Sequence, residues 1–479
     1  MQRSPYHSFS VRGAIAGRRP TAADLVESVV AEHRAGHLPD GARLPPVRAI
    51  EKQLGISKNT VQSAYDELVA RGVCVARERD GVFIATSAAT PATAPLARAS
   101  APALRALPPL KSPNKSASIQ LSSVFIDPAL LPREKLAECA RSVLRTPGLE
   151  SFYDAQGYAP LRAQIAERLT ARAMPTDPSQ VIITTGSQQA LDIVVRALAT
   201  RTVAIEDPVY SHARLLFENL GATIAPLRLD PFSGIDMDHW KRTLDARRPS
   251  LLYAITRFQN PTGYSYQTHE LEALVRHSED TGMGVLEDDW GSDMLSEGDY
   301  RPTLRSLGGD NVLYANSFTK KLLPSLRVGY LVAPEPLVPT LVAMKRLATL
   351  GNPWFTEAIL SEFLDRGYYD THLRAVQTSL DARYAHCVDA LREHMPEGCR
   401  WTLPGGGPTL WLEVPRSVDL GALSARMRAR DVNVESTVDH FAREGGEAPH
   451  LHGFRVSYAY CDEEKLTRAI AALGQELRA

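Results

Sequence analysis

Three side-chain types suited to covalent and ionic chemistry stand at fixed intervals in the second half of the chain. Asp288 ends the apolar run MGVLEDDW, and Lys320 follows it by thirty-two residues in a Ser-x-x-Lys arrangement that begins at Ser317. Arg327 stands seven residues further on. A lysine amine can bond covalently to a carbonyl group, and an arginine fork suits an anion. This spacing is far more specific than any motif near it.

Three shorter motifs are weak when taken singly. TTGSQQAL places Gly186, Ser187 and Gln188 at a strand-to-helix junction, where free backbone N–H groups favour an anion. QNPTG, residues 259–263, is more often a turn than a site, and EDDW is as often a solvated strand end. Only the combination with Lys320 and Arg327 makes them informative.

The elements around these motifs alternate between apolar runs and helical stretches. VIITTG precedes SQQALDIVVRAL, TVAIEDP precedes YSHARLLFENLG, and LLYAITR precedes THELEALVRHSEDTG. Short strands separated by helices imply right-handed crossovers and a largely parallel, buried sheet. Ligands of such sheets bind beyond the carboxyl ends of the strands, where the motifs cluster. The sequence therefore predicts an α/β body with a site at that edge.

Together these motifs resemble the fold type I pyridoxal-phosphate enzymes of the aspartate aminotransferase class, over residues 118–479. The resemblance implies a large domain with a mostly parallel sheet, a smaller α/β domain, and pyridoxal 5'-phosphate as the cofactor. It implies that Lys320 forms the internal aldimine and that Asp288 keeps the pyridine nitrogen protonated. The ring then acts as an electron sink.

The same resemblance implies further roles. Asn260 would donate to the phenolate oxygen of the ring, Tyr210 would stack on the ring, and Tyr153 would reach the phosphate of the neighbouring subunit. Arg455, in HGFRVSYAY, would bind a substrate carboxylate, which implies an amino-acid-like ligand. The implied phosphate ligands are Ser187, Gln188, Ser317 and Arg327.

Two positions near the site lack a counterpart in this resemblance. The family usually has a tyrosine shortly after the aspartate, bonded to the phenolate oxygen, whereas this chain has Trp290 there. An indole N–H can donate a hydrogen bond but cannot ionise or accept one. Lys321 has no matching role, and the sequence favours its interpretation as a flanking charge.

The first eighty or so residues have a different pattern. Residues 24–35 are predicted to form a helix, and VRAIEKQLG a short second helix closed by Gly55. ISKNTVQSAYDELVARG predicts a third helix with Ser57 as its N-cap. The runs VCVAR and GVFIA flank ERDG, which indicates a hairpin. This order predicts a winged helix-turn-helix.

The N-terminus of the third helix would enter the major groove and offer Ser57, Lys58, Asn59 and Thr60 to phosphates and base edges. Arg43, Arg48 and Lys52 would flank the DNA backbone. Residues 21–87 hold eight Lys/Arg against nine Asp/Glu, so charge does not favour DNA. A small helical interaction module therefore remains an alternative at this point.

DGARLPPVRAIEKQLGISKNTVQSAYDELVARG and GVFIA resemble the GntR class of winged-helix DNA-binding domains. The family's usual Leu-Pro-Ser-x-Arg turn is here Leu44-Pro45-Pro46-Val47-Arg48, so a hydroxyl that commonly contacts phosphate is missing. Residues 88–117 are rich in Ala and Pro, with four basic residues and no acidic one, which predicts an extended spacer. The predicted organisation is an N-terminal arm at 1–20, the winged helix-turn-helix at 21–87, a linker at 88–117 and the aminotransferase-like body at 118–479.

Bulk composition predicts a cytoplasmic location. Hydrophobic residues make up 44% and charged residues 23%, the net charge is −1, and no apolar run is long enough for a membrane span. The five cysteines form no CxxC pair, which is typical of a reduced compartment. No histidine spacing suggests a metal site.

The order of modules, with the phrases SFTKKLLPSLRVGY and FLDRGYYDTHLR, resembles the MocR group of transcriptional regulators. The resemblance implies a head-to-tail homodimer that binds operator DNA, holds pyridoxal phosphate as an aldimine and senses an amino-acid-like amine. An aminotransferase with an accessory DNA-binding or docking domain is an alternative, because every residue for proton transfer is present. A sensor of pyridoxal phosphate itself is a third.

Overall fold

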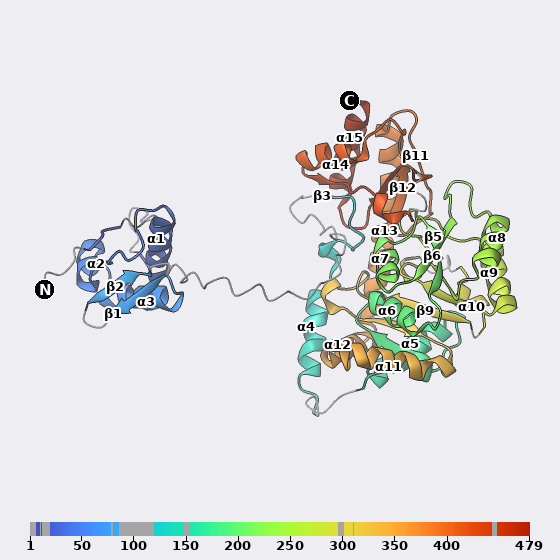
Figure 1. The fold of residues 1–479 in the computed structure, drawn as a ribbon, viewed down its shortest axis with the longest axis horizontal. Helices are drawn as coiled ribbons and strands as arrows, with labels where there is room; N and C mark the ends of the chain where they lie inside the picture. The colour runs from blue at the N-terminus through green and yellow to red at the C-terminus, as the bar shows by residue number, and fades with distance from the viewer. Residues whose placement is uncertain are drawn as a thin grey trace, which may run out of the picture. The chain divides into compact units, whose positions relative to one another are not determined.

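A computed structural model describes residues 6–9, 11, 20–77, 80–85, 119–147, 154–295, 301–309, 311–442 and 448–479. The chain divides into two compact units, Met1–Leu110 and Lys111–Ala479, which we call the head and the body (Figure 1). The linker predicted at 88–117 and most of the arm predicted at 1–20 lie outside the described residues.

The head is a helix-turn-helix followed by a small hairpin, as the sequence predicts. Its elements are α1 (Ala22–Arg34), α2 (Val47–Leu54), α3 (Lys58–Ala70), β1 (Cys74–Arg77) and β2 (Gly81–Ile84). The two strands pair antiparallel. One core cluster joins all three helices to the hairpin, with Leu25, Ile50, Val61 and Ile84 among its buried members.

Capping groups set the helix ends of the head. The Asp24 N–H donates to the Thr21 hydroxyl while the Asp24 carboxylate accepts from the Thr21 N–H, which forms a capping box at the start of α1. Ser57 accepts from the Thr60 N–H at 3.1 Å and begins α3. Gly55 ends α2 with a φ of 64°, a left-handed conformation that favours glycine.

Seven strands form the main sheet of the body in the order β4-β10-β9-β8-β7-β5-β6. They are β4 (Val181–Thr184), β5 (Thr202–Asp207), β6 (Thr223–Arg228), β7 (Leu251–Ala254), β8 (Gly284–Asp288), β9 (Val312–Ser317) and β10 (Gly329–Val332). Only β10 runs antiparallel to its neighbours, so the sheet is mostly parallel, as predicted. The carboxyl ends of the other six strands share one edge.

Helices cover both faces of this sheet. In β5, Val203 and Ile205 belong to the core that includes residues of α6 and α7, whereas Ala204 packs with residues of α8 and α9. Burial on both faces explains why the strands are continuous apolar runs. The helices are α4 (Arg133–Val143), α5 (Ala159–Thr170), α6 (Ser187–Ala197), α7 (Ser211–Asn219), α8 (Met237–Arg247), α9 (Thr268–Thr281), α10 (Leu304–Leu307), α11 (Val338–Thr349) and α12 (Trp354–Asp365).

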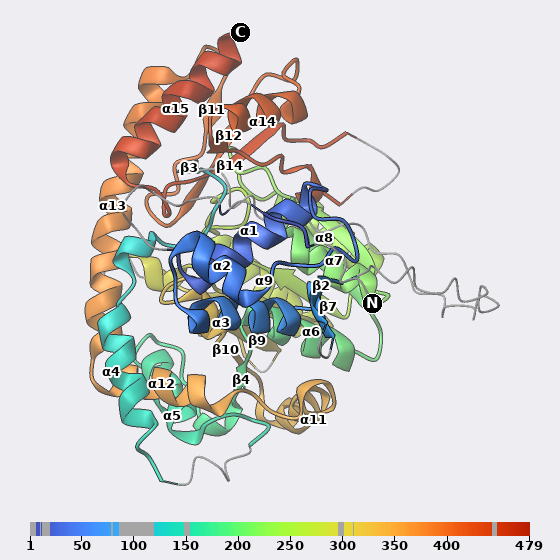
Figure 2. The ribbon, with the colours of Figure 1, turned by 90° about the vertical axis from the view of Figure 1, so that its left-hand side faces the viewer.

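A smaller lobe combines the end of the chain with the first described strand of the body. β11 (Arg400–Trp401), β12 (Thr409–Glu413) and β14 (Gly453–Ser457) form an antiparallel sheet, and β13 (Val432–Asn433) pairs in parallel with β3 (Ile119–Gln120). α14 (Leu420–Ala429) and α15 (Glu463–Arg478) pack on them. The long helix α13 (Tyr368–His394) joins both lobes (Figure 2), because Leu373 lies in one core and Leu391 in the other.

Short 3₁₀ turns complete the body. They are η1 (Pro128–Leu130), η3 (Pro178–Gln180), η4 (Ser292–Met294), η5 (Pro324–Leu326), η6 (Glu335–Leu337) and η7 (Val438–His440). Within the described residues, no helix combines the length and the apolar character needed to cross a membrane.

The head has its own core, so its stability should respond to a core truncation independently of the body. We expect Leu68→Ala, which empties a fully buried site, to lower the free energy of head unfolding by about 2–5 kcal/mol. Val69→Ala, at the neighbouring but 36% exposed position, should change it by less than about 0.5 kcal/mol. Hydrogen exchange resolved by peptide should show faster exchange across α1 and α3 in the first variant and unchanged exchange in the body. Equal effects of the two variants would contradict this assignment of the core.

Candidate functional site

The residues predicted to bind the cofactor come from loops at one edge of the main sheet. They are Ser187 after β4, Tyr210 after β5, Asn260 after β7, Asp288 at the end of β8, and Ser317 and Lys320 at and after the end of β9. The Lys320 Nζ atom lies 5.5 Å from the centre of the Tyr210 ring and 4.3 Å from the Trp290 ring. The structure thus brings the predicted amine and the predicted stacking ring together.

Asp288 is a buried carboxyl with one open oxygen. Its Oδ2 accepts a hydrogen bond from the Tyr253 hydroxyl at 2.9 Å, whereas its Oδ1 is buried and has no partner. Burial raises the pKa of Asp288, while the nearby Lys320 ammonium and the Tyr253 hydrogen bond act in the opposite direction. An open, buried acceptor suits an N–H donor from a bound group.

Lys320 is half-buried, and its charged form is disfavoured. Removal from water lowers the pKa of Lys320 to about 8, and the positive charges of Arg455, Lys321 and Arg327 lower it too. The Asp288 carboxylate opposes the shift. A substantial share of the amine is therefore neutral at physiological pH, which a nucleophilic lysine requires.

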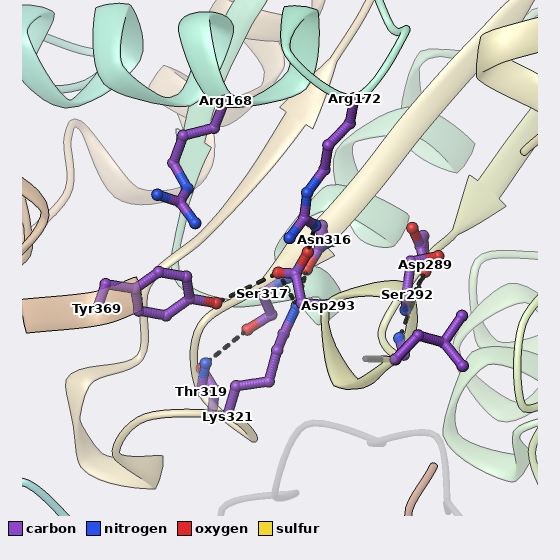
Figure 3. Close-up of polar contacts among 12 residues, drawn as sticks. Arg168, Arg172, Asp289, Ser292, Asp293, Asn316, Ser317, Thr319, Lys321 and Tyr369 are labelled. Carbon is purple, nitrogen blue, oxygen red and sulfur yellow. Dashed lines mark hydrogen bonds and ion pairs between the residues drawn. The ribbon is translucent and has the colours of Figure 1, made fainter. Parts of the chain in front are cut away.

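Lys321 turns the other way and is buried, with 1% of its surface exposed. Its ammonium donates to Asp293 Oδ2 at 2.8 Å and to Asn316 Oδ1 at 2.7 Å (Figure 3). The interpretation of Lys321 as a flanking charge is therefore wrong, because its ammonium is buried and bonded to two side chains. The reason is that its partners come from distant segments of the chain, which the sequence around Lys321 does not reveal.

The residues predicted to bind phosphate surround the start of α6. Arg327 lies next to Gly186, because a Cβ at that glycine would approach the Arg327 Nη2 atom to 3.1 Å. The guanidinium also donates to the Thr185 carbonyl at 3.0 Å. Ser317 Oγ accepts from the Thr319 N–H at 3.1 Å. A helix N-terminus beside an arginine combines free N–H groups with positive charge, which suits a dianion.

Gln188 and Ser187 lie in the first turn of α6 and are half-buried. The Gln188 amide donates to the His212 carbonyl at 3.4 Å, so this side chain is directed toward α7. His212 itself stacks on Tyr210, with ring centroids 5.4 Å apart. Tyr153, predicted to reach the partner's phosphate, lies outside the described residues.

Arg455 and Asn260 are hydrogen-bonded to each other across the two lobes. Arg455, in β14, donates through Nη1 to Asn260 Oδ1 at 2.7 Å and through Nη2 to the Ser122 carbonyl at 2.7 Å. Its Nε atom is buried and has no hydrogen-bond partner. Because Asn260 Oδ1 faces Arg455, the amide NH₂ of Asn260 faces away from it and is oriented to donate elsewhere.

Trp290 occupies the position where the family usually has tyrosine. Its indole N–H donates to the Phe258 carbonyl at 3.1 Å, and the side chain is 4% exposed. The only donor of this side chain is therefore engaged with the backbone. Trp290 provides an aromatic surface below the Lys320 amine rather than a polar group.

Sequence reasoning missed several groups at the site: Tyr253, His212, Ser122 and the partners of Lys321. Tyr253 lies in β7, and its apolar strand run gave no sign of a buried hydroxyl that holds Asp288. The role of Ser122 rests on its backbone carbonyl, which no side-chain pattern can indicate. Among the described residues, no three His, Cys, Asp or Glu side chains are grouped as they would be to hold a metal ion.

The head places the predicted DNA contacts on two surfaces. Ser57, Lys58 and Asn59 are exposed at the start of α3, where Thr60 is half-buried and shares a 2.9 Å hydrogen bond with Ser57. Arg48 is exposed on α2.

Arg43, also predicted to contact DNA, packs against the hairpin. Its guanidinium lies 5.9 Å from the Phe83 ring and 3.9 Å from the Asp80 carboxylate. A role for Arg43 at the DNA backbone would therefore place that contact beside the hairpin.

Comparisons with known proteins match the head and the body to two different families. Residues 126–473 match the family described as aminotransferase class I and II, and residues 21–84 match the bacterial regulatory proteins of the gntR family. The probable rhizopine catabolism regulatory protein MocR of Rhizobium meliloti is 28% identical over 95% of this chain and 93% of its own. The HTH-type transcriptional regulator TauR of Rhodobacter capsulatus is 27% identical over 93% and 94%.

Among solved structures, the chain resembles LysN, the alpha-aminoadipate aminotransferase of Thermus thermophilus, complexed with N-(5'-phosphopyridoxyl)-L-leucine. The identity is 31%, the TM-score is 0.70, and the match covers 76% of this chain and 92% of that one. The fold and the two matches define a helix-turn-helix regulator with an aminotransferase body. The chain belongs to the class I and II aminotransferase family and, within it, to the GntR-type transcriptional regulators of the MocR group. Aminotransferase domains of this class typically bind pyridoxal phosphate.

The pKa of Lys320 predicts how its amine reacts. Only the neutral amine is nucleophilic, so labelling by acetic anhydride should rise with pH to a midpoint near pH 8 and then level off. An ordinary lysine has a pKa of about 10.4. Because the Asp288 carboxylate raises this pKa, Asp288→Asn should move the midpoint to lower pH. Mass spectrometry of Lys320 in the cofactor-free chain measures both effects. A midpoint close to that of ordinary lysine would show that the amine is not desolvated.

Proposed function

We propose that this regulator binds pyridoxal phosphate covalently through Lys320, senses an amino-acid-like amine at the same site, and changes its affinity for operator DNA in response. The observation that supports it best is the open Oδ1 of Asp288, buried at the same strand edge as a desolvated amine. A protonated ring nitrogen would fill that open acceptor. The residues present therefore fit the cofactor.

When bound, pyridoxal phosphate supplies an aldehyde that reacts with primary amines and a ring that withdraws electrons. The roles of the protein residues follow from their positions. Lys320 supplies the neutral amine, Asp288 holds a proton-bearing ring nitrogen, and Tyr210 provides a stacking surface. Asn260, oriented by Arg455, has its NH₂ free to donate. Phosphate would lie against Ser187, Gln188, Ser317 and Arg327, with Tyr153 from the partner subunit.

Arg455 gives the site its selectivity for carboxylates. Its Nε atom is buried without a partner, and its two terminal nitrogens are bonded to an amide oxygen and a backbone carbonyl. A ligand carboxylate would form stronger, charge-assisted bonds with the guanidinium. The relative crystallised with N-(5'-phosphopyridoxyl)-L-leucine holds such an amino-acid conjugate. We therefore assign the effector to the amino-acid-like amines.

The head would bind duplex DNA with the start of α3 in the major groove. Ser57, Lys58, Asn59 and Thr60 lie at that end of the helix, and the helix dipole adds positive potential there. Arg43 and Arg48 would contact the backbone. Two heads of a head-to-tail homodimer would read two half-sites, and a protein with this role works in the cytoplasm.

A second function, catalytic transamination, is favoured by one observation. A transaminase, LysN, is 31% identical over 76% of the chain, and Lys320 and Asp288 could move protons for it. Trp290 argues for a changed chemistry, because its N–H is engaged with Phe258 and no phenol stands in its place. A sensor of pyridoxal phosphate alone would differ only in which ligand changes DNA affinity.

Lys320→Ala tests the covalent site. We expect this variant to lose the absorption band of protein-bound cofactor and all effect of amino acids on DNA affinity, because no amine remains to react with the aldehyde. Binding to duplex DNA should persist, since the head is a separate unit. Lys241→Ala, on the exposed surface of α8, is the matched control and should behave as wild type. A band that still responds to amines in Lys320→Ala would refute the assignment.

Lys58→Ala tests the DNA surface. If Lys58 neutralises one phosphate, the variant should bind all duplexes more weakly, and the slope of log affinity against log salt should fall by about 1. Arg71→Ala is the control, because Arg71 lies at the other end of α3 and pairs with Glu67. Fluorescence anisotropy with a duplex selected from a random-sequence library measures both. An unchanged slope for Lys58→Ala would place the DNA elsewhere.

A further inference from the structure

The residues that directly follow Asp288 and Lys320 in the chain belong to a second polar cluster. Asp289 follows Asp288, and Lys321 follows Lys320. Both are buried, and Figure 3 shows them among side chains from several segments. The buried cluster consists of Arg172, Asp289, Asp293, Tyr314, Asn316, Lys321 and Tyr369.

Hydrogen bonds connect the two loops through this cluster. The Tyr314 hydroxyl donates to Asp289 Oδ2 at 2.6 Å and accepts from Asn316 Nδ2 at 3.1 Å. Asn316 Oδ1 accepts from the Lys321 ammonium, which also donates to Asp293. A continuous chain of side-chain hydrogen bonds therefore links the loop after Asp288 to the turn that holds Lys320.

The backbone of the Lys320 turn is held on both sides of Lys320. Before it, the Ser317 N–H donates to Asn316 Oδ1 at 2.6 Å. After it, the Lys321 carbonyl lies 2.7 Å from His372 Nε2, in α13. With the Lys321 side chain also fixed, the main chain at Lys320 directs its side chain toward the Trp290 and Tyr210 rings.

The cluster also keeps the charged groups of Lys321 and Asp293 away from water, whereas the Arg172 side chain is 31% exposed. Arg172 and Tyr369 both donate to Asp293 in addition to Lys321. Burial lowers the pKa of Lys321, whereas the Asp289 carboxylate and the 2.8 Å ion pair with Asp293 favour its charged form. Removing one member of a buried charged group leaves its partner uncompensated, so Lys321 is costly to replace. A surface lysine would have none of these effects.

We propose that Lys321 is a positioning residue for Lys320: held by Asp293 and Asn316, it fixes the turn after β9 and aims the Lys320 amine toward Asp288. The proposal rests on the proposed function, in which Lys320 forms the bond to the cofactor. Lys321 also contributes electrostatically, because its positive charge favours the neutral form of Lys320.

The charged and titratable groups around Lys320 come from several elements. They are Asp288 of β8, Arg455 of β14, Lys321 and Arg327 of the segment after β9, and Tyr210 and His212 at the start of α7. Of these, Lys321 is the direct neighbour of Lys320 in the chain, and its side chain is bonded to Asp293 and Asn316. Changing Lys321 therefore alters the charge and aim of Lys320 without removing a group from the site itself.

The test uses two substitutions of Lys321 in the full chain. Lys321→Gln keeps donors for Asp293 and Asn316 but removes the charge, whereas Lys321→Met removes both. In the acetic anhydride assay on cofactor-free protein, both variants should move the midpoint of Lys320 labelling to higher pH. When pyridoxal phosphate is added, at a pH where the Lys320 amine is fully neutral, Lys321→Met should also react with it more slowly. The expected loss of capture rate is on the order of 10- to 100-fold for an amine misplaced by about 1 Å. Lys321→Gln should retain most of that rate.

The matched control is Lys345→Met. Lys345 is a second fully buried lysine, in α11, and its ammonium donates to the Ala155 carbonyl at 2.6 Å. We expect this variant to lose stability, because a buried donor is removed, but to leave the labelling midpoint and the capture rate of Lys320 unchanged. If Lys321→Met does not fold, the test rests on Lys321→Gln alone, through the pH midpoint of Lys320 labelling.

The outcomes separate this proposal from the proposed function. Folded Lys321 variants with wild-type midpoint and capture rate would show that Lys321 is only structural. The same changes in Lys345→Met would show a general effect of lost stability and would also overturn the proposal. Failure of the wild-type chain to capture pyridoxal phosphate at Lys320, shown by peptide mapping after borohydride reduction, would instead refute the proposed function. The labelling midpoints would still report on Lys321 in that case.

Discussion

The alternation of side-chain directions at the end of a strand determines how this site is built. At the end of β8, Asp288 faces the site while Asp289 faces the buried cluster, because successive residues of a strand point to opposite faces. Lys320 and Lys321, in the turn after β9, also have different partners: Lys320 lies over the Trp290 ring, and Lys321 bonds to Asp293 in the buried cluster. A shift of one residue in β8 would exchange the open carboxyl of Asp288 for its buried neighbour Asp289. Neighbouring residues of the chain are therefore divided between the site and the buried cluster.

The buried polar groups next to the site have hydrogen-bond partners, as buried polar atoms generally do. Glu206, beneath the QNPTG loop, accepts from the Ile255 N–H, the Gln259 amide and the Tyr266 hydroxyl. Burial raises the pKa of Glu206 to about 8 even with these partners. Gln259 is thereby fixed next to Asn260. Against this background, the open Oδ1 of Asp288 and the open Nε of Arg455 are sites where a ligand group would replace a missing partner.

The sequence predicted the framework of this molecule well, because the framework depends on local patterns. Continuous apolar strands, the Ser57 cap and the position of Gly55 all follow from short segments, and the structure has each of them. The spacing of Asp288 and Lys320 placed both residues at the same strand edge. Family resemblance then supplied roles that the spacing alone could not.

The partners of those residues were not predictable, because they come from distant segments. Lys321 meets Asp293 across 28 residues, and Arg455 meets the Ser122 carbonyl across 333. No periodicity in one sequence indicates such pairs. The direction of a side chain after a strand end is equally hidden. The motif could single out Lys320, but the buried environment of Lys321 could not be predicted from its neighbours in the chain.

The contact between Arg455 and Ser122 limits how an effector could act. Ser122 follows β3, the first described strand after the predicted linker, so its carbonyl lies close in sequence to the segment that leads to the head. A carboxylate that displaced this carbonyl would exchange a neutral acceptor for a charged one, a gain of about 1–2 kcal/mol. Moving a two-state equilibrium from 1:99 to 99:1 needs about 5.5 kcal/mol of differential binding. Arg455 alone would therefore produce only a partial response. The remainder would have to come from other groups of the ligand, and in the proposed function the amine that reacts at the same site as Lys320 is the one available.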